Sequence, residues 1–163
     1  MINIAIGAKK RCGKYYKALR QKSFFNNAIK IREEKWYEEF NNRFSVDFWN
    51  KSWAFIKEIE YENKIKGLQY NIVRFSLKTN STVHHFKPYV SPLCTYCGLE
   101  NEGIPHLFWY CNVVNNFYRD ICDFFMLINI DVPFNKNKII FGIHDKKPDT
   151  LSNFIILAMK QYI

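Results

Sequence analysis

Three cysteines and one histidine are concentrated in one short stretch of this chain, residues 94–111, which reads CTYCGLENEGIPHLFWYC. The four candidate metal ligands are Cys94, Cys97, His106 and Cys111. Two cysteines separated by two residues can direct both thiolates toward one ion through a tight turn, and Gly98 eases the turn that follows. Thiolates with one imidazole suit tetrahedral Zn²⁺, whereas Ca²⁺, Mg²⁺ and Mn²⁺ prefer oxygen ligands. The spacing therefore predicts a closed, structural zinc site rather than an open catalytic one.

Two other interpretations of these residues remain open. They could be buried structural cysteines beside a hydrogen-bonded core histidine, because free cysteine is often buried. A disulfide framework is weaker, because Cys94 and Cys97 are too close for a framework bridge and the total of five cysteines is odd. His84 and His85 are alternative ligands for the same ion. The clustering of four ligand types within 18 residues favours zinc.

The spacing of His106 and Cys111 restricts the backbone between them. Five residues correspond to about 140° around a regular α-helix. One uninterrupted helix would therefore direct the two side chains away from a common ion. We expect residues 104–110 to form a short turn or helical piece that breaks near Cys111, followed by a second helix with Asn112 as its cap.

The same stretch resembles the zinc-binding segment of reverse transcriptases from LINE-type non-LTR retrotransposons. That family follows the Cys-x2-Cys pair with an acidic stretch, then His-Leu-Phe, then the last cysteine. Here Glu100 and Glu102 supply the acidic stretch, and residues 106–108 match the triplet. Two positions depart from the family pattern, since Gly103 replaces a common Thr and Phe117-Tyr118 stands where Trp is usual. Neither position is a ligand.

The resemblance extends over residues 30–163. Upstream, the family's helical pattern before the knuckle is matched by Leu68-Gln69, Thr79-Asn80 and Phe86, and residues 151–163 resemble its terminal helix. The resemblance implies a C-terminal module of an RNA-directed DNA polymerase, which would hold template RNA or target DNA.

The sequence lacks the residues that such a polymerase needs for catalysis. The family carries its metal-binding aspartates in a (Phe/Tyr)-Ala-Asp-Asp motif, and this chain contains no Asp-Asp pair. Endonuclease motifs, a glycine-rich phosphate loop, a nucleophile elbow and a His-Glu-x-x-His motif are also absent. We therefore expect a non-catalytic protein. The abrupt apolar ending at Tyr162-Ile163 favours a fragment of a longer element, and a degenerate fragment without independent activity is one alternative.

Positive charge is concentrated near the N-terminus. The chain carries 24 basic and 15 acidic residues, and residues 1–22 contain seven basic side chains and no acidic one. Such a block attracts polyanions, and tyrosines among the cations add the stacking surface that single-stranded nucleic acid uses. The predicted nucleic-acid contacts are Lys9, Lys10, Arg11, Lys14, Tyr15, Tyr16, Lys17 and Arg20. The alternatives are a solvated basic tail and, for the whole chain, a structural zinc domain that packs on a partner protein.

The periodicity of apolar residues predicts a mostly α fold, a small helical domain built around a CCHC zinc knuckle. We expect a basic N-terminal segment over residues 1–26 and a helical domain over residues 27–163. The expected helices span residues 27–41, 45–61, 62–78, 80–86, 112–129 and 149–163, and residues 138–142 are expected to be a short strand or extended piece.

The expected inward faces of three helices follow from the spacing of their apolar residues. They are Val46, Trp49, Trp53 and Ile56 in the second helix; Val114, Phe117, Ile121, Phe124, Phe125 and Ile128 in the fifth; and Leu151, Phe154, Ile155, Ala158 and Tyr162 in the last.

No apolar run approaches the length of about 18 residues that a membrane span needs. Near the N-terminus, apolar residues precede basic ones, which is the reverse of a secretory signal. We therefore expect an intracellular protein, cytoplasmic or nuclear, in a reducing compartment that suits thiolate ligands.

Overall fold

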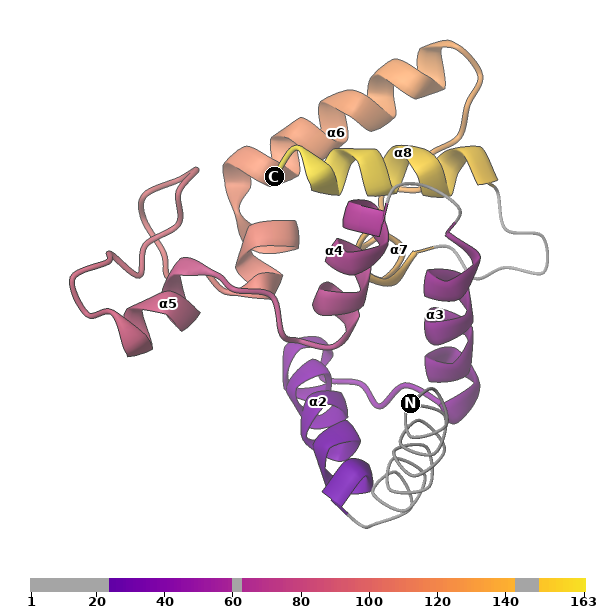
Figure 1. The fold of residues 1–163 in the computed structure, drawn as a ribbon. Helices are drawn as coiled ribbons and strands as arrows, with labels where there is room; N and C mark the ends of the chain where they lie inside the picture. The colour runs from indigo at the N-terminus through magenta and orange to yellow at the C-terminus, as the bar shows by residue number, and fades with distance from the viewer. Residues whose placement is uncertain (1–23, 60–62, 143–149) are drawn as a thin grey trace, which may run out of the picture. The chain divides into compact units, whose positions relative to one another are not determined.

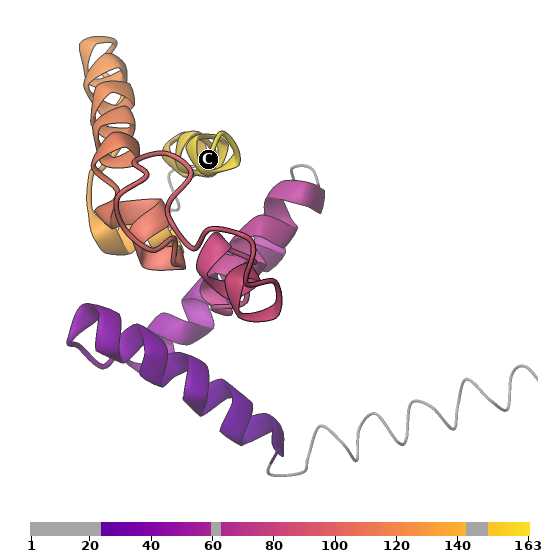
Figure 2. The ribbon, with the colours of Figure 1, turned by 90° about the vertical axis from the view of Figure 1, so that its left-hand side faces the viewer.

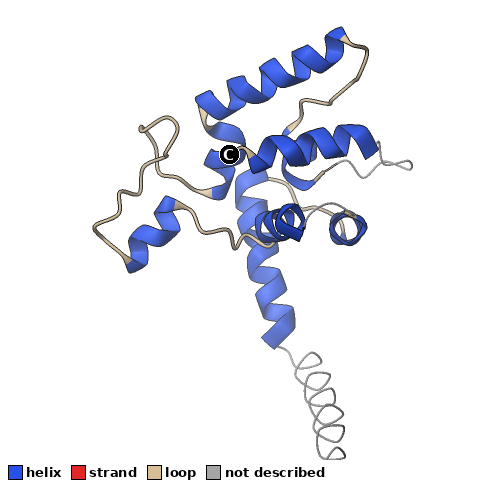
Figure 3. Ribbon diagram, turned by 45° about the horizontal axis from the view of Figure 1, so that its top comes forward, coloured by secondary structure: helices blue, strands red, loops and turns tan. Residues whose placement is uncertain are grey.

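The structure, a computed structural model, describes residues 24–59, 63–142 and 150–163. The chain divides into two compact units between Arg43 and Phe44 (Figure 1). All regular elements of the described residues are helical, and one isolated β-bridge joins Leu93 to Asn101 (Figure 3). The prediction of a mostly α fold is confirmed. Among the described helices, none is long and apolar enough to cross a membrane.

The described part of the first unit consists of helix α2, Phe24–Phe40, and residues 41–43. The helix begins three residues before the expected start, and within it the rings of Trp36 and Phe40 form an aromatic pair with centroids 5.9 Å apart. The guanidinium of Arg43 lies 5.0 Å above the ring of Tyr37, which is a cation–π distance.

The first helix of the second unit is α3, Val46–Glu58, which begins one residue after the expected start. The hydroxyl of Ser45 accepts a hydrogen bond from the Phe48 N–H at 3.1 Å and satisfies one free donor of the first turn. The predicted inward face is partly wrong, because Val46 is 77% exposed. The buried residues of α3 are Trp49, Ser52 and Ile56.

Helix α4, Asn63–Val73, packs on α3 and is shorter than predicted. It ends where Phe75 adopts a left-handed backbone with φ of 54°. The ammonium of Lys66 donates to the carbonyls of Lys57 and Ile59, which are acceptors that the end of α3 leaves without helical partners. This basic residue therefore joins two helices.

A short helix replaces the strand expected over residues 138–142. Helix α7 spans Lys136–Phe141, and the Asn135 side chain caps it by accepting from the Asn137 N–H at 2.9 Å. The run Ile139–Phe141 is fully buried. The helix ends at Gly142, whose φ of 91° excludes most other residues and whose missing Cβ would lie 2.5 Å from the Phe55 ring.

Helices α6, Asn112–Leu127, and α8, Thr150–Gln161, pack against each other around the main core of this unit. They run in opposite directions in Figure 1, and Figure 2 views α8 nearly along its axis. Their inward faces match the prediction in part, since Val114 and Ile155 are buried and Phe117, Ile121 and Phe125 pack against the core. In α6 the buried residues are Val114, Tyr118 and Cys122. In α8 they are Ser152, Asn153, Ile155, Ile156, Leu157, Met159 and Lys160.

Relative to the predicted inward face, α8 is rotated about its own axis, because its polar residues form buried hydrogen bonds. Lys160 is 1% exposed. Its ammonium donates hydrogen bonds to Gln69 Oε1 of α4 at 2.6 Å and to the Ile140 carbonyl at 3.0 Å. The amide of Gln69 donates to the same carbonyl at 3.1 Å. Ser152 donates to the Asp131 carbonyl at 2.8 Å. Buried polar groups are tolerated when they are hydrogen-bonded in this way.

The burial of Lys160 predicts a pH dependence of stability. Burial lowers the pKa of its amine from 10.5 to about 7 in the folded protein. Between these values the unfolded chain binds more protons, so the free energy of unfolding should rise with pH, by about 2 kcal/mol from pH 7 to pH 9. Lys160→Met should remove this rise, as measured by urea unfolding at both pH values.

Lys57→Met is the matched control, because the Lys57 side chain is exposed. Its pH profile should parallel that of the wild type. A Lys160→Met profile that also parallels the wild type would contradict the assignment.

Candidate metal centre

The first two candidate ligands lie in a loop that closes on itself. The Cys94 N–H donates to the Glu100 carbonyl at 2.7 Å, and the Gly98 N–H donates to the Cys94 carbonyl at 2.9 Å. Gly98 has a φ of +66°, a conformation that costs other residues free energy. The role predicted for this glycine is therefore confirmed, and the turn holds Cys94 and Cys97 on one side of the loop.

The other two ligands flank a π-helical turn, η1, His106–Tyr110. The Cys111 N–H donates to the His106 carbonyl at 2.8 Å, a hydrogen bond that spans five residues instead of four. Cys111 then takes an extended conformation and becomes the N-cap of α6. The predicted break is confirmed, whereas the predicted cap is wrong by one residue because Asn112 is already helical.

The four ligand atoms converge. All lie within 4.8 Å of one another, Cys94 Sγ is 3.8 Å from Cys111 Sγ, and Cys97 Sγ is 3.4 Å from His106 Nε2. With metal–sulfur bonds of about 2.3 Å, sulfurs at two corners of a tetrahedron lie about 3.8 Å apart. The cluster can therefore hold a metal ion with little rearrangement.

The histidine is oriented for ligation through Nε2. Its Nδ1 lies 3.0 Å from Glu100 Oε2, and its side chain is 9% exposed. A carboxylate on the far nitrogen fixes the ring and selects the tautomer that leaves Nε2 free to bind a metal. Glu100 therefore acts through His106 as a positioning residue.

The two cysteines of the loop differ in acidity. The N–H groups of Leu99 and Glu100 lower the pKa of the Cys97 thiol to about 6. Burial raises the pKa of the Cys94 thiol. Cys97 therefore loses its proton more readily than Cys94, and metal ligation requires the thiolate of both.

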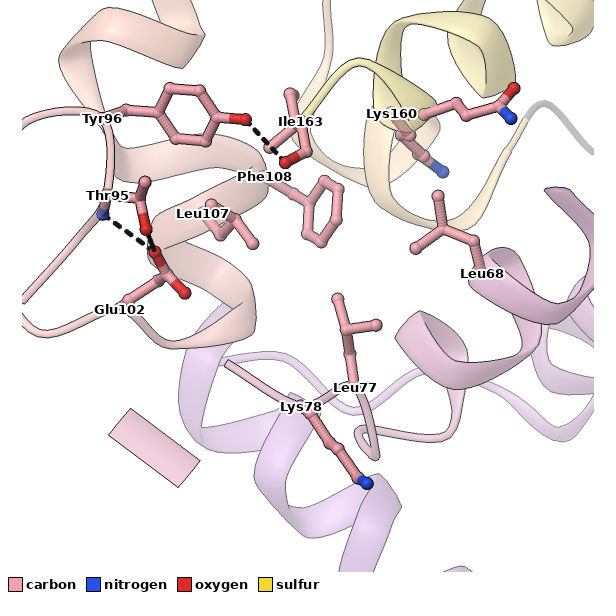
Figure 4. A pocket seen from close by; sticks show the side chains of 11 residues that line it. Leu68, Leu77, Lys78, Thr95, Tyr96, Glu102, Leu107, Phe108, Lys160 and Ile163 are labelled. Atoms are coloured by element: carbon pink, nitrogen blue, oxygen red, sulfur yellow. Dashed lines mark hydrogen bonds between the residues drawn. The ribbon is translucent and has the colours of Figure 1, made fainter. Parts of the chain in front are cut away.

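A buried carboxylate ties the ligand loop to the preceding helix, α5, Asn80–Phe86. Glu102 is 6% exposed; its Oε1 accepts from the Asn80 N–H at 2.9 Å, and its Oε2 accepts from the Thr95 N–H and hydroxyl, both at 2.9 Å (Figure 4). The Asn80 N–H is a free donor of the first turn of α5, so Glu102 caps this helix from 22 residues away. The sequence indicated an acidic stretch but not this role.

A pocket of about 300 Å³ lies beside this carboxylate, between η1, the ligand loop and the end of α8 (Figure 4). The side chains that line it include Leu68, Leu77, Phe108 and Lys160. The Lys160 ammonium and the Glu102 carboxylate both reach the pocket wall, but their hydrogen bonds are made to the protein.

The cluster of candidate ligands is continuous with the hydrophobic core. Cys94 is 2% exposed and Cys111 is fully buried, and both pack with Val114 and Tyr118 of α6. The Tyr118 hydroxyl has no hydrogen-bond partner among the described residues, and burial raises its pKa well above the ordinary value. The ligands and α6 are therefore one packing unit.

The other candidate residues lie apart from the cluster. The Nδ1 atom of His84 lies at hydrogen-bond distance, 2.7 Å, from the Val90 carbonyl oxygen, and His85 is exposed. Neither histidine belongs to the cluster of four candidate ligands. Cys122 is buried on α6. The predicted nucleic-acid contacts between Lys9 and Arg20 lie outside the described residues and stay predictions.

The sequence matches no protein-family model and no curated protein. The resemblance to the retrotransposon zinc-binding region therefore rests on the residues quoted above.

The Glu102 network predicts a large effect of a small substitution. Glu102→Gln keeps the shape of the side chain but replaces one acceptor oxygen with a donor that faces N–H groups. We expect a loss of about 2–3 kcal/mol in the free energy of unfolding, measured with urea on the reduced, metal-loaded protein. Glu58→Gln, on an exposed carboxylate at the end of α3, should change it by less than about 0.5 kcal/mol. Equal effects of the two substitutions would contradict the capping role.

Proposed function

We propose that this chain is a zinc-stabilised, non-catalytic module that binds nucleic acid, as the C-terminal zinc-binding region of a LINE-type non-LTR retrotransposon reverse transcriptase. The observation that carries the proposal is the convergence of Cys94, Cys97, His106 and Cys111 on one point. Three thiolates and one imidazole form a soft donor set, which zinc prefers over the harder divalent cations.

The geometry supports a structural role for the ion. Four protein ligands complete a tetrahedron and leave no position for a substrate or a water molecule. Two of them, Cys94 and Cys111, belong to the buried core. Zinc in such sites contributes on the order of 10–16 kcal/mol of apparent binding free energy at neutral pH, comparable to the stability of a whole domain.

Nucleic acid is the partner that the charge supports. The net charge is +9, and seven of the 24 basic residues lie in residues 1–22. Phosphate backbones bind such segments without sequence preference, and Tyr15 and Tyr16 offer stacking surface to unpaired bases. This arrangement suits a module that holds template RNA or target DNA while a separate polymerase domain acts on it.

A protein-interaction domain is the second candidate, and exposed apolar residues near the ligand loop favour it. Phe86 is 82% exposed, Tyr89 is 81% exposed and Leu99 is 76% exposed. They belong to α5 and the loop that carries the first two ligands, which project from the rest of the second unit in Figure 1. Competition by an unrelated acidic protein in a salt titration of RNA binding separates nucleic-acid recognition from general attraction to acidic surfaces.

The zinc assignment predicts one metal ion per chain. Metal analysis by mass spectrometry should find about one zinc ion per chain in the purified, reduced protein. The Cys94→Ser and Cys111→Ser variants should lose the zinc and have lower melting temperatures. Glu100→Gln should weaken the affinity about 10-fold or more, because it removes the charged partner of His106. Cys122→Ala is the matched control and should keep the metal. Folded wild-type protein without zinc would exclude the assignment.

The nucleic-acid assignment predicts a change in salt dependence. Replacing Lys9, Lys10, Arg11, Lys14 and Lys17 with Gln should weaken RNA binding and reduce the slope of log affinity against log salt by roughly 0.7–0.9 per lost contact. Fluorescence anisotropy with single-stranded RNA measures both quantities. The control variant replaces Arg43, Lys51, Lys57, Lys87 and Arg119 with Gln, which removes the same charge from exposed positions elsewhere. Equal losses in the two variants would show that only net charge matters.

A further inference from the structure

The exposed residues of α8 are mostly apolar, and Gln161 is a polar exception. The one charged residue of the helix, Lys160, is buried, and so are Ser152 and Asn153. By contrast Phe154 is 41% exposed, and Tyr162, just after the helix, is 82% exposed. A surface helix normally places its polar residues outward, but α8 buries Ser152, Asn153 and Lys160 together with its core apolar residues and leaves Leu151 and Phe154 exposed.

Helix α6 continues this apolar surface. A groove of about 320 Å³ runs between the two helices. It is lined by Phe117, Ile121, Phe125, Phe154, Ile155, Ala158, Met159 and Tyr162. On the α6 side, Phe124, Leu127 and Ile128 are 57%, 83% and 52% exposed. Phe124 and Ile128 follow Phe117 and Ile121 at helical spacing, so they form a ridge beside the groove.

We propose that this α6/α8 face is the interface through which two copies of the chain form a symmetric dimer. A two-fold axis makes the same patch meet itself, so the patch must contain both halves of the contact. The face satisfies this condition, because an apolar groove and an apolar ridge lie side by side on it. Each copy can place its ridge in the groove of the other.

The exposed area is sufficient for a stable dimer. The large apolar side chains of this face are Phe124, Leu127, Ile128, Leu151, Phe154 and Tyr162. At roughly 150–250 Å² for a large apolar side chain, their exposed parts amount to about 550–900 Å² per copy. A standard specific interface takes about 800 Å² from each partner. Soluble proteins rarely leave a patch of this size in water.

Charge also favours this face over other surfaces. The chain carries a net charge of +9, which makes two copies repel each other over most approaches. The exposed residues of α8 whose burial is described carry no charge, whereas Arg119, Asp120 and Asp123 of α6 are exposed. A contact made mainly through α8 and the end of α6 therefore buries few charges.

Analytical ultracentrifugation of the full, reduced and zinc-loaded chain tests the proposal. Between about 1 and 100 µM we expect conversion from monomer to dimer. The double substitution Phe124→Glu with Leu127→Glu should raise the dimer dissociation constant at least about 100-fold, because it buries four carboxylates in one interface. The matched control is Phe86→Glu with Tyr89→Glu, at similarly exposed apolar positions of α5 and the following loop, which should leave the dimer intact.

Hydrogen–deuterium exchange of the wild type gives a second readout that does not depend on the folding of a variant. At dimer concentrations, amide protection should increase in residues 112–128 and 150–163. A chain that stays monomeric over the whole range, a series of species larger than a dimer, or protection confined to other segments would each overturn the proposal. Failure of RNA binding would leave this test unaffected, because no RNA is present in it.

Discussion

The hydrogen bond from the Cys111 N–H to the His106 carbonyl is the constraint on which the metal cluster depends. A four-residue hydrogen bond in this place would continue an α-helix and direct the two side chains about 140° apart. The five-residue bond widens the turn, so both ligand atoms lie within 4.8 Å of the cysteines of the loop. π-helical turns are rare and occur mostly at functional sites. Here the π-helical turn places Cys111 on the same side of the backbone as His106.

Two carboxylates, one exposed and one buried, hold the ligand loop next to this turn. Glu100 is mostly exposed and orients the His106 ring. Glu102 is buried and joins the loop to α5 through Asn80 and Thr95. One residue separates Glu100 from Glu102 in the sequence, yet Glu100 contacts the candidate ligand His106 and Glu102 contacts backbone N–H groups. A bound ion would therefore join α5, the loop, η1 and α6 into one structure, which is how a small amount of chain can form a stable module.

The sequence predicted the parts of the fold that depend on local chemistry. The ligand set, the turn at Gly98 and the break before Cys111 all follow from residue types and short spacings. The inward faces of α3, α6 and α8 followed only in part, because burial there also depends on distant partners. Gln69 and Lys160 are buried since they share the Ile140 carbonyl across three helices, and a polar residue with distant partners looks like a surface residue in the sequence. Helix α7 was missed because the short apolar run Ile139–Phe141 has no periodicity that separates a helix from a strand.

X-ray absorption at the zinc edge tests the central claim most directly, because it reports the ligands of the bound ion without a substitution. For the purified, reduced chain we predict a four-coordinate site with three sulfur ligands at about 2.3 Å and one nitrogen ligand at about 2.0 Å. A site with two or fewer sulfurs, or with oxygen ligands in place of the histidine, would show that Cys94, Cys97, His106 and Cys111 do not hold the ion together.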